Sequence, residues 1–366
     1  MSKKEHTVKN TEPLFHITKR SNISLKRALI IRGAAVLASI VIMSIVMFIL
    51  AKENPFKLLG SMLSGAFGTP LRIWVLFSDT AILLGISLAL TPAFKMKFWN
   101  CGGEGQVMIG SLISAMMMLF VGDKLSFPLL IAATVVLSIV AGSVWGLIPA
   151  IFKAKWNTNE TLFTLMMNYI AIQLVTYFLK LFGNAQGNLE PMPQFAIPQI
   201  LNGPYFLNIA LILVICAMMY VYLRFSKQGY EIAVVGESEK TAKYIGINVP
   251  KVIIRTMIIS GALCGLIGFL LVANGSCSVT TTIAGGRGFT AILVSWLGKF
   301  NPIYMILTSF LVVFLQRGTS FMGEIYRLDT SMADIFIGVV LLFIIGCEFF
   351  INYKVNFRKR NKGGNN

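Results

Sequence analysis

The chain of 366 residues is 56% hydrophobic and only 13% charged, whereas an average soluble domain is about 25% charged. Several apolar stretches approach the roughly 20 residues that cross a hydrocarbon core, so an all-α polytopic membrane protein is expected rather than a soluble domain. The net charge of +17 suits either a nucleic-acid binder or the cytoplasmic loops of a membrane protein.

Ten apolar segments follow one another along the chain, so about ten transmembrane segments are expected. They cover about 33–51, 73–92, 105–121, 126–152, 161–180, 205–223, 252–273, 289–297, 303–316 and 333–352. The eighth is too short to cross a bilayer alone, which predicts a half-helix. The segments form a transmembrane domain over 33–352, with basic tails over 1–32 and 353–366.

The basic residues gather on one side of this predicted topology. With the N-terminus inside, 23 Lys and Arg residues fall in cytoplasmic segments and 8 in outer segments. Membrane proteins carry such an excess in their cytoplasmic loops, so both termini and the loop 224–251 are expected in the cytoplasm. Orientation in the membrane accounts for the charge, and binding to nucleic acid is not expected.

A glycine-rich stretch, FWNCGGEGQVMIG, stands at 98–110. It lacks the third glycine and the preceding strand of a dinucleotide fingerprint, and no Walker motif occurs in the chain. The chain is therefore expected to bind no cofactor and to hydrolyse no ATP. Two compatible interpretations remain: the glycines break or pack helices, or the break presents Asn100, Glu104 and Gln106 to a substrate pathway.

The glycine pattern recurs later in the chain. GGEG at 102–105 returns as GGRG at 285–288, 183 residues further on. On the predicted topology the first copy follows an inward-running span and the second an outward-running span, as in the inverted repeats of many transporters. A chance match is the alternative in a chain with 32 glycines.

Two other polar side chains lie inside apolar segments. Asp79 is a functional candidate because ionisable groups are costly in a membrane, and its alternative role is pairing or snorkelling near the outer interface. Asn168 either bridges helices or bonds a ligand. The two histidines, His6 and His16, lie in the N-terminal tail and the five cysteines are scattered, so neither a catalytic nor a metal site is expected.

Four motifs occur in order: NCGGEGQVMIG (100–110), NETLFTLMMNYIA (159–171), GESEKTAKYIGINVPKVIIRTMIISGALCGLIGFL (236–270) and GGRGFTAILVSWLGKFNP (285–302). Together they resemble the permease subunits of ABC importers in the simple-sugar and branched-chain amino-acid branch, and most of all the bacterial nucleoside permeases. The resemblance implies a vitamin-B12-importer-type permease in the bacterial plasma membrane. It also implies three partners: a second permease subunit, an ABC ATPase that uses ATP and Mg, and a substrate-binding lipoprotein.

In this family the loop after the sixth span docks into the ATPase. The resemblance implies that role for residues of the segment 236–248, namely Glu237, Glu239, Ala242, Tyr244 and Gly246. Ala242 and Gly246 match the family signature, whereas Lys240 stands where the family has an acidic residue. The alternative is an ordinary solvated loop.

The expected function is therefore a non-enzymatic permease subunit that translocates nucleosides, and a simple-sugar permease is the alternative. A base needs aromatic faces, and Phe77, Trp99, Phe163 and Tyr169 are candidates, although core packing explains such rings too. The substrate pathway is predicted at Asn100, Glu104, Gln106, Asn168 and Asp79. A secondary transporter needs an ion-coupling site and a membrane enzyme needs a catalytic constellation, and the sequence indicates neither.

Overall fold

The computed structural model describes residues 15–19, 24–51, 54–184, 187–197, 205–274, 277–327 and 330–357. The chain forms two compact units. The first contains the residues up to Gly65 and from Gly318 onward, and the second runs from Ala66 to Arg317. Each boundary falls inside a helix, so helices rather than loops connect the units.

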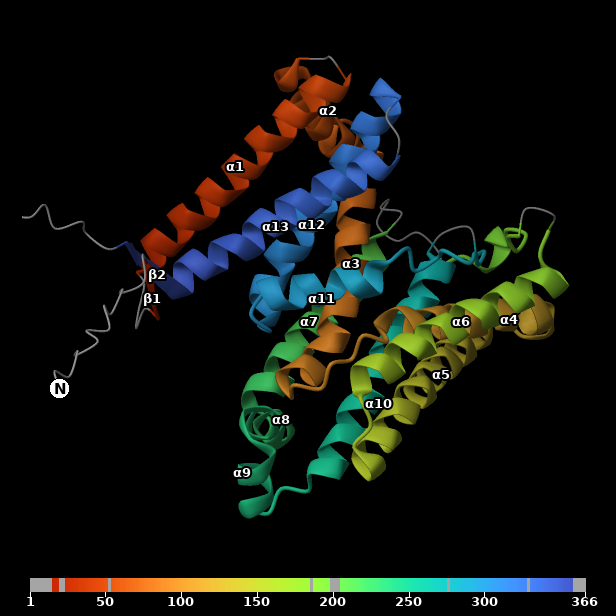
Figure 1. Ribbon diagram of the computed structural model, residues 1–366. Helices are drawn as coiled ribbons and strands as arrows, with labels where there is room; N and C mark the ends of the chain where they lie inside the picture. The colour runs from red at the N-terminus through yellow and green to blue at the C-terminus, as the bar shows by residue number, and fades with distance from the viewer. Residues whose placement is uncertain are drawn as a thin grey trace, which may run out of the picture. The chain divides into compact units, whose positions relative to one another are not determined.

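The first unit is built on two long helices. Its elements are β1 (Phe15–Lys19), α1 (Leu25–Ala51), most of α2 (Pro55–Phe67), the end of α12 (Pro302–Tyr326), α13 (Thr330–Asn352) and β2 (Tyr353–Phe357). Helix α1 packs along α13 (Figure 1). Helix α2 approaches the end of α12 so closely that a Cβ on Gly65 would lie 2.6 Å from the Cβ of Phe321.

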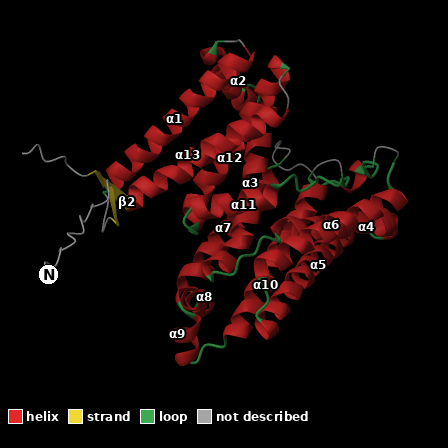
Figure 2. Ribbon diagram, in the orientation of Figure 1, coloured by secondary structure: helices red, strands yellow, loops and turns green. Residues whose placement is uncertain are grey.

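A short ribbon ties the two predicted tails together. Strands β1 and β2 pair antiparallel, from Phe15 opposite Phe357 to Lys19 opposite Tyr353, and they are the two strands coloured yellow in Figure 2. The sequence predicted two separate tails, and this pairing was not foreseen. Because hydrogen-bonded strands are about 5 Å apart, the described parts of the two tails lie side by side.

In the second unit, all the regular secondary structure of the described residues is helical. Its helices are α3 (Pro70–Lys95), α4 (Gly103–Val121), α5 (Phe127–Trp156), α6 (Glu160–Phe182), α7 (Phe206–Phe225), α8 (Lys227–Glu237), α9 (Glu239–Tyr244), α10 (Val249–Ala273), α11 (Arg287–Leu297) and the first part of α12, with short 3-10 turns at Gly122–Lys124 and Pro193–Phe195. Helix α3 contacts α7, α10 and α11.

Side-chain caps mark where several of these helices begin. The side chain of Thr69 accepts the backbone N–H of Arg72 at the start of α3, and Asn159 and Asn248 do the same for α6 and α10. Such caps satisfy one of the backbone N–H groups that a helix start leaves unpaired. The polar residues between the apolar runs therefore define the helix boundaries.

Glycines bring α10 into backbone contact with α4 and α5. A Cβ on Gly142 of α5 would lie 2.2 Å from the carbonyl oxygen of Gly261 on α10. A Cβ on Gly110 of α4 would lie 2.5 Å from the carbonyl oxygen of Gly265. Small residues allow such close approach in membrane helices, where packing replaces the hydrophobic effect.

Among the described residues, seven helices are long and apolar enough to cross a membrane: α3, α4 with the turn that follows it, α5, α6, α7, α10 and α12. The predicted short eighth segment is the 11-residue α11. The first and tenth predicted segments lie in α1 and α13. The helical multi-pass organisation is confirmed, and the count of ten spans stays a prediction.

Candidate functional site

A turn and a short extended stretch separate α3 from α4. Lys97 adopts a left-handed conformation with φ of 60°, and the N–H of Phe98 donates to the carbonyl of Ala93. Gly102 then stands just before α4 and offers no side-chain cap. The helix break that the sequence predicted at the glycines therefore exists, and its polar groups need partners from other elements.

Asn100 lies in the break, is fully buried and makes one hydrogen bond within the break and one to α10. Its Oδ1 accepts the N–H of Gly102 at 3.0 Å, and its Nδ2 donates to Ser260 Oγ on α10 at 3.1 Å. Gln106 Nε2 lies 3.5 Å from the same Oδ1. The Oε1 of Gln106 is buried without a partner among the described residues, so it can still accept a hydrogen bond.

Asn168 of α6 joins the two sides of the break. Its Oδ1 accepts the N–H of Gly105 at 2.8 Å, and its Nδ2 donates to the carbonyl of Cys101 at 2.8 Å. A Cβ on Gly105 would lie 2.8 Å from that Oδ1. Asn168 was expected either to bridge helices or to bond a ligand, and the structure shows it bridging two segments.

Glu104 caps α11 across the fold. Its Oε1 accepts the N–H of Gly286 at 2.8 Å and its Oε2 accepts the N–H of Gly288 at 2.7 Å. A carboxylate is favoured at a helix N-terminus because unpaired N–H groups and the helix dipole both attract negative charge. The two glycine motifs, GGEG and GGRG, are therefore in direct contact.

Cys101 lies in the break, with its backbone N–H donating to Thr164 Oγ1 at 3.1 Å. Burial raises the pKa of the Cys101 thiol, and the nearby carboxylate of Glu160 raises it further. That carboxylate is paired with Lys153 Nζ at 2.9 Å. The thiol is therefore held in its protonated, less reactive form.

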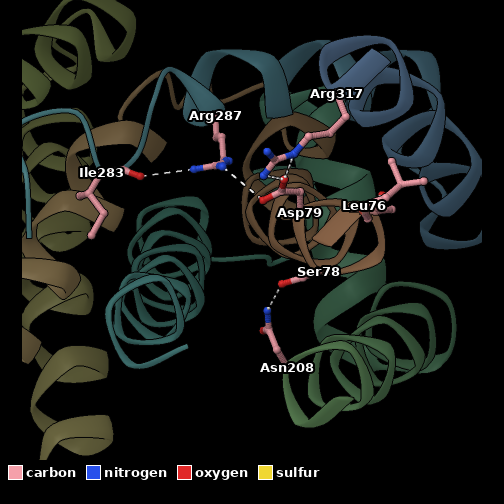
Figure 3. A network of polar contacts seen from close by, with 8 residues as sticks. Leu76, Ser78, Asp79, Asn208, Ile283, Arg287 and Arg317 are labelled. Carbon is pink, nitrogen blue, oxygen red and sulfur yellow. Dashed lines mark hydrogen bonds and ion pairs between the residues drawn. The ribbon is translucent and has the colours of Figure 1, made fainter. Parts of the chain in front are cut away.

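Asp79 of α3 makes two ion pairs. Its Oδ1 accepts from Arg287 Nη2 at 3.3 Å, and its Oδ2 accepts from the guanidinium of Arg317 on α12 (Figure 3). Arg287 also donates to the carbonyl of Ile283. Because Arg287 stands between Gly286 and Gly288, Asp79 and Glu104 hold the same first turn of α11.

A cavity of about 150 Å³ adjoins this ion-pair cluster. Its polar lining comes from Ser78, Asp79, Tyr205, Asn208, Asn274 and Arg317. Of these the sequence indicated only Asp79. Asn208 and Asn274 lie near the ends of two apolar segments, and the predicted topology places both ends on one side of the membrane. This shared side was the one signal in the sequence that could have grouped the two residues.

The segment predicted to couple to the ATPase, 236–248, contains the end of α8 and the whole of α9. Ser238 separates them, and its side chain accepts the N–H of Thr241 at 3.2 Å. Gly246 ends the segment with φ of +84°, a conformation that favours glycine. A helix therefore lies between Gly236 and Gly246, and it is α9, which begins directly after Ser238.

One face of this segment is packed and the other is exposed. Ala242 is fully buried in an apolar cluster that includes Ile232 and Val249, whereas Tyr244 is 92% exposed. Glu237 and Glu239 are also exposed. The exposed face is free to meet another surface.

Two contacts join α8 to the transmembrane helices. Arg255 of α10 donates to Glu231 at 2.9 Å. A Cβ on Gly236 would lie 2.1 Å from the carbonyl oxygen of Lys95, the last residue of α3. The segment therefore contacts the chain directly before the helix break that carries Asn100 and Glu104.

The family signature described as branched-chain amino acid transport system, permease component, matches residues 70–345. The chain belongs to this family of ABC transporter permeases. The match includes the helix break, the α8–α9 segment and α11. The permease is a multi-pass membrane protein, and its relatives are transport subunits rather than enzymes.

Several characterised permeases are similar along most of their length. The glucose permease protein TsgB13 of Haloferax volcanii is 27% identical over 302 residues, 77% of this chain and 77% of that protein. The guanosine permease protein NupP of Bacillus subtilis is 28% identical over 301 residues, which are 78% of this chain and 82% of that protein. The nucleoside permease protein NupB of Lactococcus lactis is 28% identical over 315 residues, which are 78% of this chain and 84% of that protein. No solved structure matches the chain significantly.

Proposed function

We propose that this permease is the membrane subunit of an ATP-driven importer of nucleosides. Two of the similar permeases are named for guanosine and nucleoside transport, and one is named for glucose. The relatives therefore leave two substrate classes, and a feature of the chain itself is needed to choose between them.

A cluster of aromatic rings beside the helix break carries the nucleoside proposal. Trp99 and Trp296 lie with ring centroids 5.4 Å apart, and they are 42% and 51% exposed. Phe94 packs edge-on against Trp99 at 5.9 Å. Exposed indole faces offer a stacking surface to a nucleobase, whereas a hydroxyl-rich sugar depends mainly on hydrogen-bonding partners.

The substrate path runs past the break in this proposal. Asn100, Glu104, Gln106 and Asn168 border it, and Gln106 Oε1, which is buried and without a partner among the described residues, becomes an acceptor for a hydroxyl or amino group when the path opens. Asp79 borders its other end. The contacts with substrate are weak and transient, because tight binding would stop release.

Coupling to ATP hydrolysis takes place at the α8–α9 segment. An ABC ATPase docks on the exposed face formed by Glu237, Glu239, Tyr244 and Gly246, with Ala242 anchoring α9 from beneath. Closure of the ATPase is transmitted through the Gly236–Lys95 contact to the break after α3. A second permease subunit and a substrate-binding lipoprotein complete the importer, and alternating access follows from a shift between inward-open and outward-open populations.

The membrane topology in this proposal has ten spans with both termini in the cytoplasm of a bacterial cell, and the fold is of the vitamin-B12-importer type. The excess of basic residues in the loops that would be cytoplasmic supports this orientation, and the pairing of β1 with β2 supports an even number of spans. Labelling of a cysteine at position 240 by an impermeant reagent in intact cells would overturn it.

Uptake by the complete reconstituted importer tests the substrate. Labelled guanosine is expected to enter in an ATP-dependent manner, and glucose and ribose are expected not to compete. Trp99→Ala should reduce uptake of guanosine several-fold, whereas Trp156→Ala, which removes an exposed ring at the end of α5, serves as the control. If free sugars compete and nucleosides do not, the simple-sugar alternative replaces the nucleoside proposal.

A further inference from the structure

Helix α8 contacts three transmembrane helices at successive positions, and it lies beside the ends of α7 and α10 (Figure 1). At its start, a Cβ on Gly229 would lie 2.4 Å from the carbonyl oxygen of Tyr222 near the end of α7. At its end, Gly236 approaches the last residue of α3 just as closely. Between these two glycines, Glu231 pairs with Arg255 of α10. Of the three contacts, only the middle one is an attraction between charges.

The ion pair of Glu231 and Arg255 is largely withdrawn from water. The side chains of Arg255 and Glu231 are 25% and 18% exposed, and Nη2 lies 2.9 Å from Oε2. The Nε of Arg255 is buried with no partner among the described residues. The phenol of Tyr222 interacts with the same guanidinium and donates to Gln228 Oε1 at 3.1 Å. Because either charge would be left poorly hydrated and unpaired, α8 and α10 resist separation at this point.

The apolar contacts around the ion pair hold α8 and α10 together in a different way. Ile232 of α8 shares a buried cluster with Val252 and Ile253 of α10. Burial of apolar surface attracts without a preferred direction, whereas a charge-assisted hydrogen bond also imposes a geometry. The ion pair therefore fixes which part of α8 faces which part of α10.

A displacement of α10 reaches other helices of the second unit. The backbone of α10 contacts Gly142 of α5 and Gly110 of α4. Asn100, in the helix break before α4, donates to Ser260 Oγ on α10 at 3.1 Å. Movement of α10 is therefore passed to α4, to α5 and to the helix break.

We propose that the Glu231–Arg255 pair makes α10 follow the α8–α9 segment, so that ATP-driven movement of that segment rearranges α4, α5 and the helix break. The inference rests on the proposed docking of an ABC ATPase at α8–α9, and it adds a route through α10 to the one through α3. A backbone contact at a glycine mainly resists the approach of two helices, whereas an ion pair also resists their separation. Glu231 and Arg255 are thus positioning residues that act through α10.

The test measures guanosine imported per ATP hydrolysed by the complete importer reconstituted into vesicles. Glu231→Gln and Arg255→Gln are each expected to lower this ratio about five- to tenfold, the effect of one lost hydrogen bond between charged groups. Hydrolysis of ATP and recovery of the ATPase should persist, because the exposed docking face is unchanged. The double variant with Glu231→Arg and Arg255→Glu restores an ion pair and should regain most of the ratio.

The pair of Lys153 and Glu160 provides the matched control. Its atoms are also 2.9 Å apart, and its side chains are 20% and 13% exposed. It joins the end of α5 to the start of α6 instead of reaching α8. Lys153→Gln should therefore lower thermal stability as the other single variants do, but leave the ratio unchanged. If the swapped double variant does not insert, Arg255→Lys replaces it, since it keeps the charge and should retain more coupling than Arg255→Gln.

A second measurement does not depend on transport. Hydrogen exchange of the permease is compared with and without ATP, in complex with an ATPase variant that binds ATP but does not hydrolyse it. In the wild type, ATP is expected to change exchange in α8, in α9 and at the start of α10. In Glu231→Gln the change should be confined to α8 and α9. The same change of α10 in both proteins, single variants with the wild-type ratio, or an inserted swap that regains no coupling overturns the inference.

Failure of the proposed function gives different results. If wild-type vesicles import only free sugars, the nucleoside proposal fails, and the ratio is measured with ribose, which leaves the test of the ion pair intact. If ATP changes exchange in neither α8 nor α9 of the wild type, docking of the ATPase at this segment fails. The ion pair then has no movement to transmit, and the inference is overturned together with the docking.

Discussion

Glu104 and Gly288 are 184 positions apart in the chain, yet the Glu104 carboxylate accepts the N–H of Gly288 at 2.7 Å. The backbones meet as well, since a Cβ on Gly288 would lie 2.3 Å from the backbone nitrogen of Glu104. The start of α11 is therefore fixed both by charge and by the absence of a side chain. This relationship makes the α4–α11 junction sensitive to a single methyl group.

Gly288→Ala is expected to destabilise the permease by roughly 1–3 kcal/mol, because the new methyl group collides with backbone that cannot rotate away. Gly286→Ala is the matched comparison. Gly286 has φ of +72° but no neighbour within 4 Å of an added Cβ, so only backbone strain of about 1 kcal/mol is expected. Thermal unfolding in detergent gives both values, and an equal loss in the two variants contradicts the close contact.

Asp79→Asn is expected to cost more stability than removal of either arginine alone, because it leaves two guanidinium groups without their shared carboxylate. Both arginines are partly exposed, so each pair should contribute no more than about 1 kcal/mol. Double-mutant cycles with Arg287→Gln and Arg317→Gln measure the two coupling energies separately. Additive effects in both cycles would show that the ion pairs do not stabilise the fold.

Cys101 is expected to react slowly with maleimides at neutral pH, because thiolate is the reactive form and its pKa is raised. The half-maximal labelling rate should therefore occur at a higher pH than for a free thiol. Glu160→Gln removes the carboxylate that opposes ionisation, so it should shift the profile toward lower pH and speed labelling at pH 7. Mass spectrometry of the labelled peptide follows the reaction, and a profile unaffected by Glu160→Gln contradicts the electrostatic contribution.

Tyr244→Ala is expected to weaken recovery of the ATPase with the permease while leaving the permease folded, because the ring is almost fully exposed. Ala242→Asp should instead disrupt α9 itself, since the site is buried among apolar side chains and a carboxylate there has no partner. Co-purification and thermal unfolding together separate the two effects. Normal ATPase recovery with Tyr244→Ala would exclude this face as the docking surface.

The sequence predicted the helices well because long apolar runs leave little choice of structure in a membrane. It also located the helix break and the short eighth segment, since glycine and segment length are local signals. It recognised both glycine motifs but not their contact, because a carboxylate capping a helix 182 residues away depends on tertiary packing.

Other features lay beyond a local reading of the chain. Asn208 and Asn274 each end an apolar run, where an asparagine is unremarkable until a neighbouring helix brings a second amide close. The strands β1 and β2 are five residues each, and their pairing depends on two chain ends that only the fold brings together. The role of substrate contact for Asn100, Gln106 and Asn168 stays a prediction.

The glycine contacts of α10 also determine which parts of the molecule can move. Where the carbonyl of Gly261 lies against Gly142 and that of Gly265 against Gly110, sliding by even one residue would drive a larger side chain into backbone. Helices α4, α5 and α10 must therefore travel as a single rigid block during a transport cycle. The first turn of α11 is held to α4 of this block both by the hydrogen bonds of Glu104 and by the close approach of Gly288 to its backbone, so a movement of α11 away from α4 has to break both.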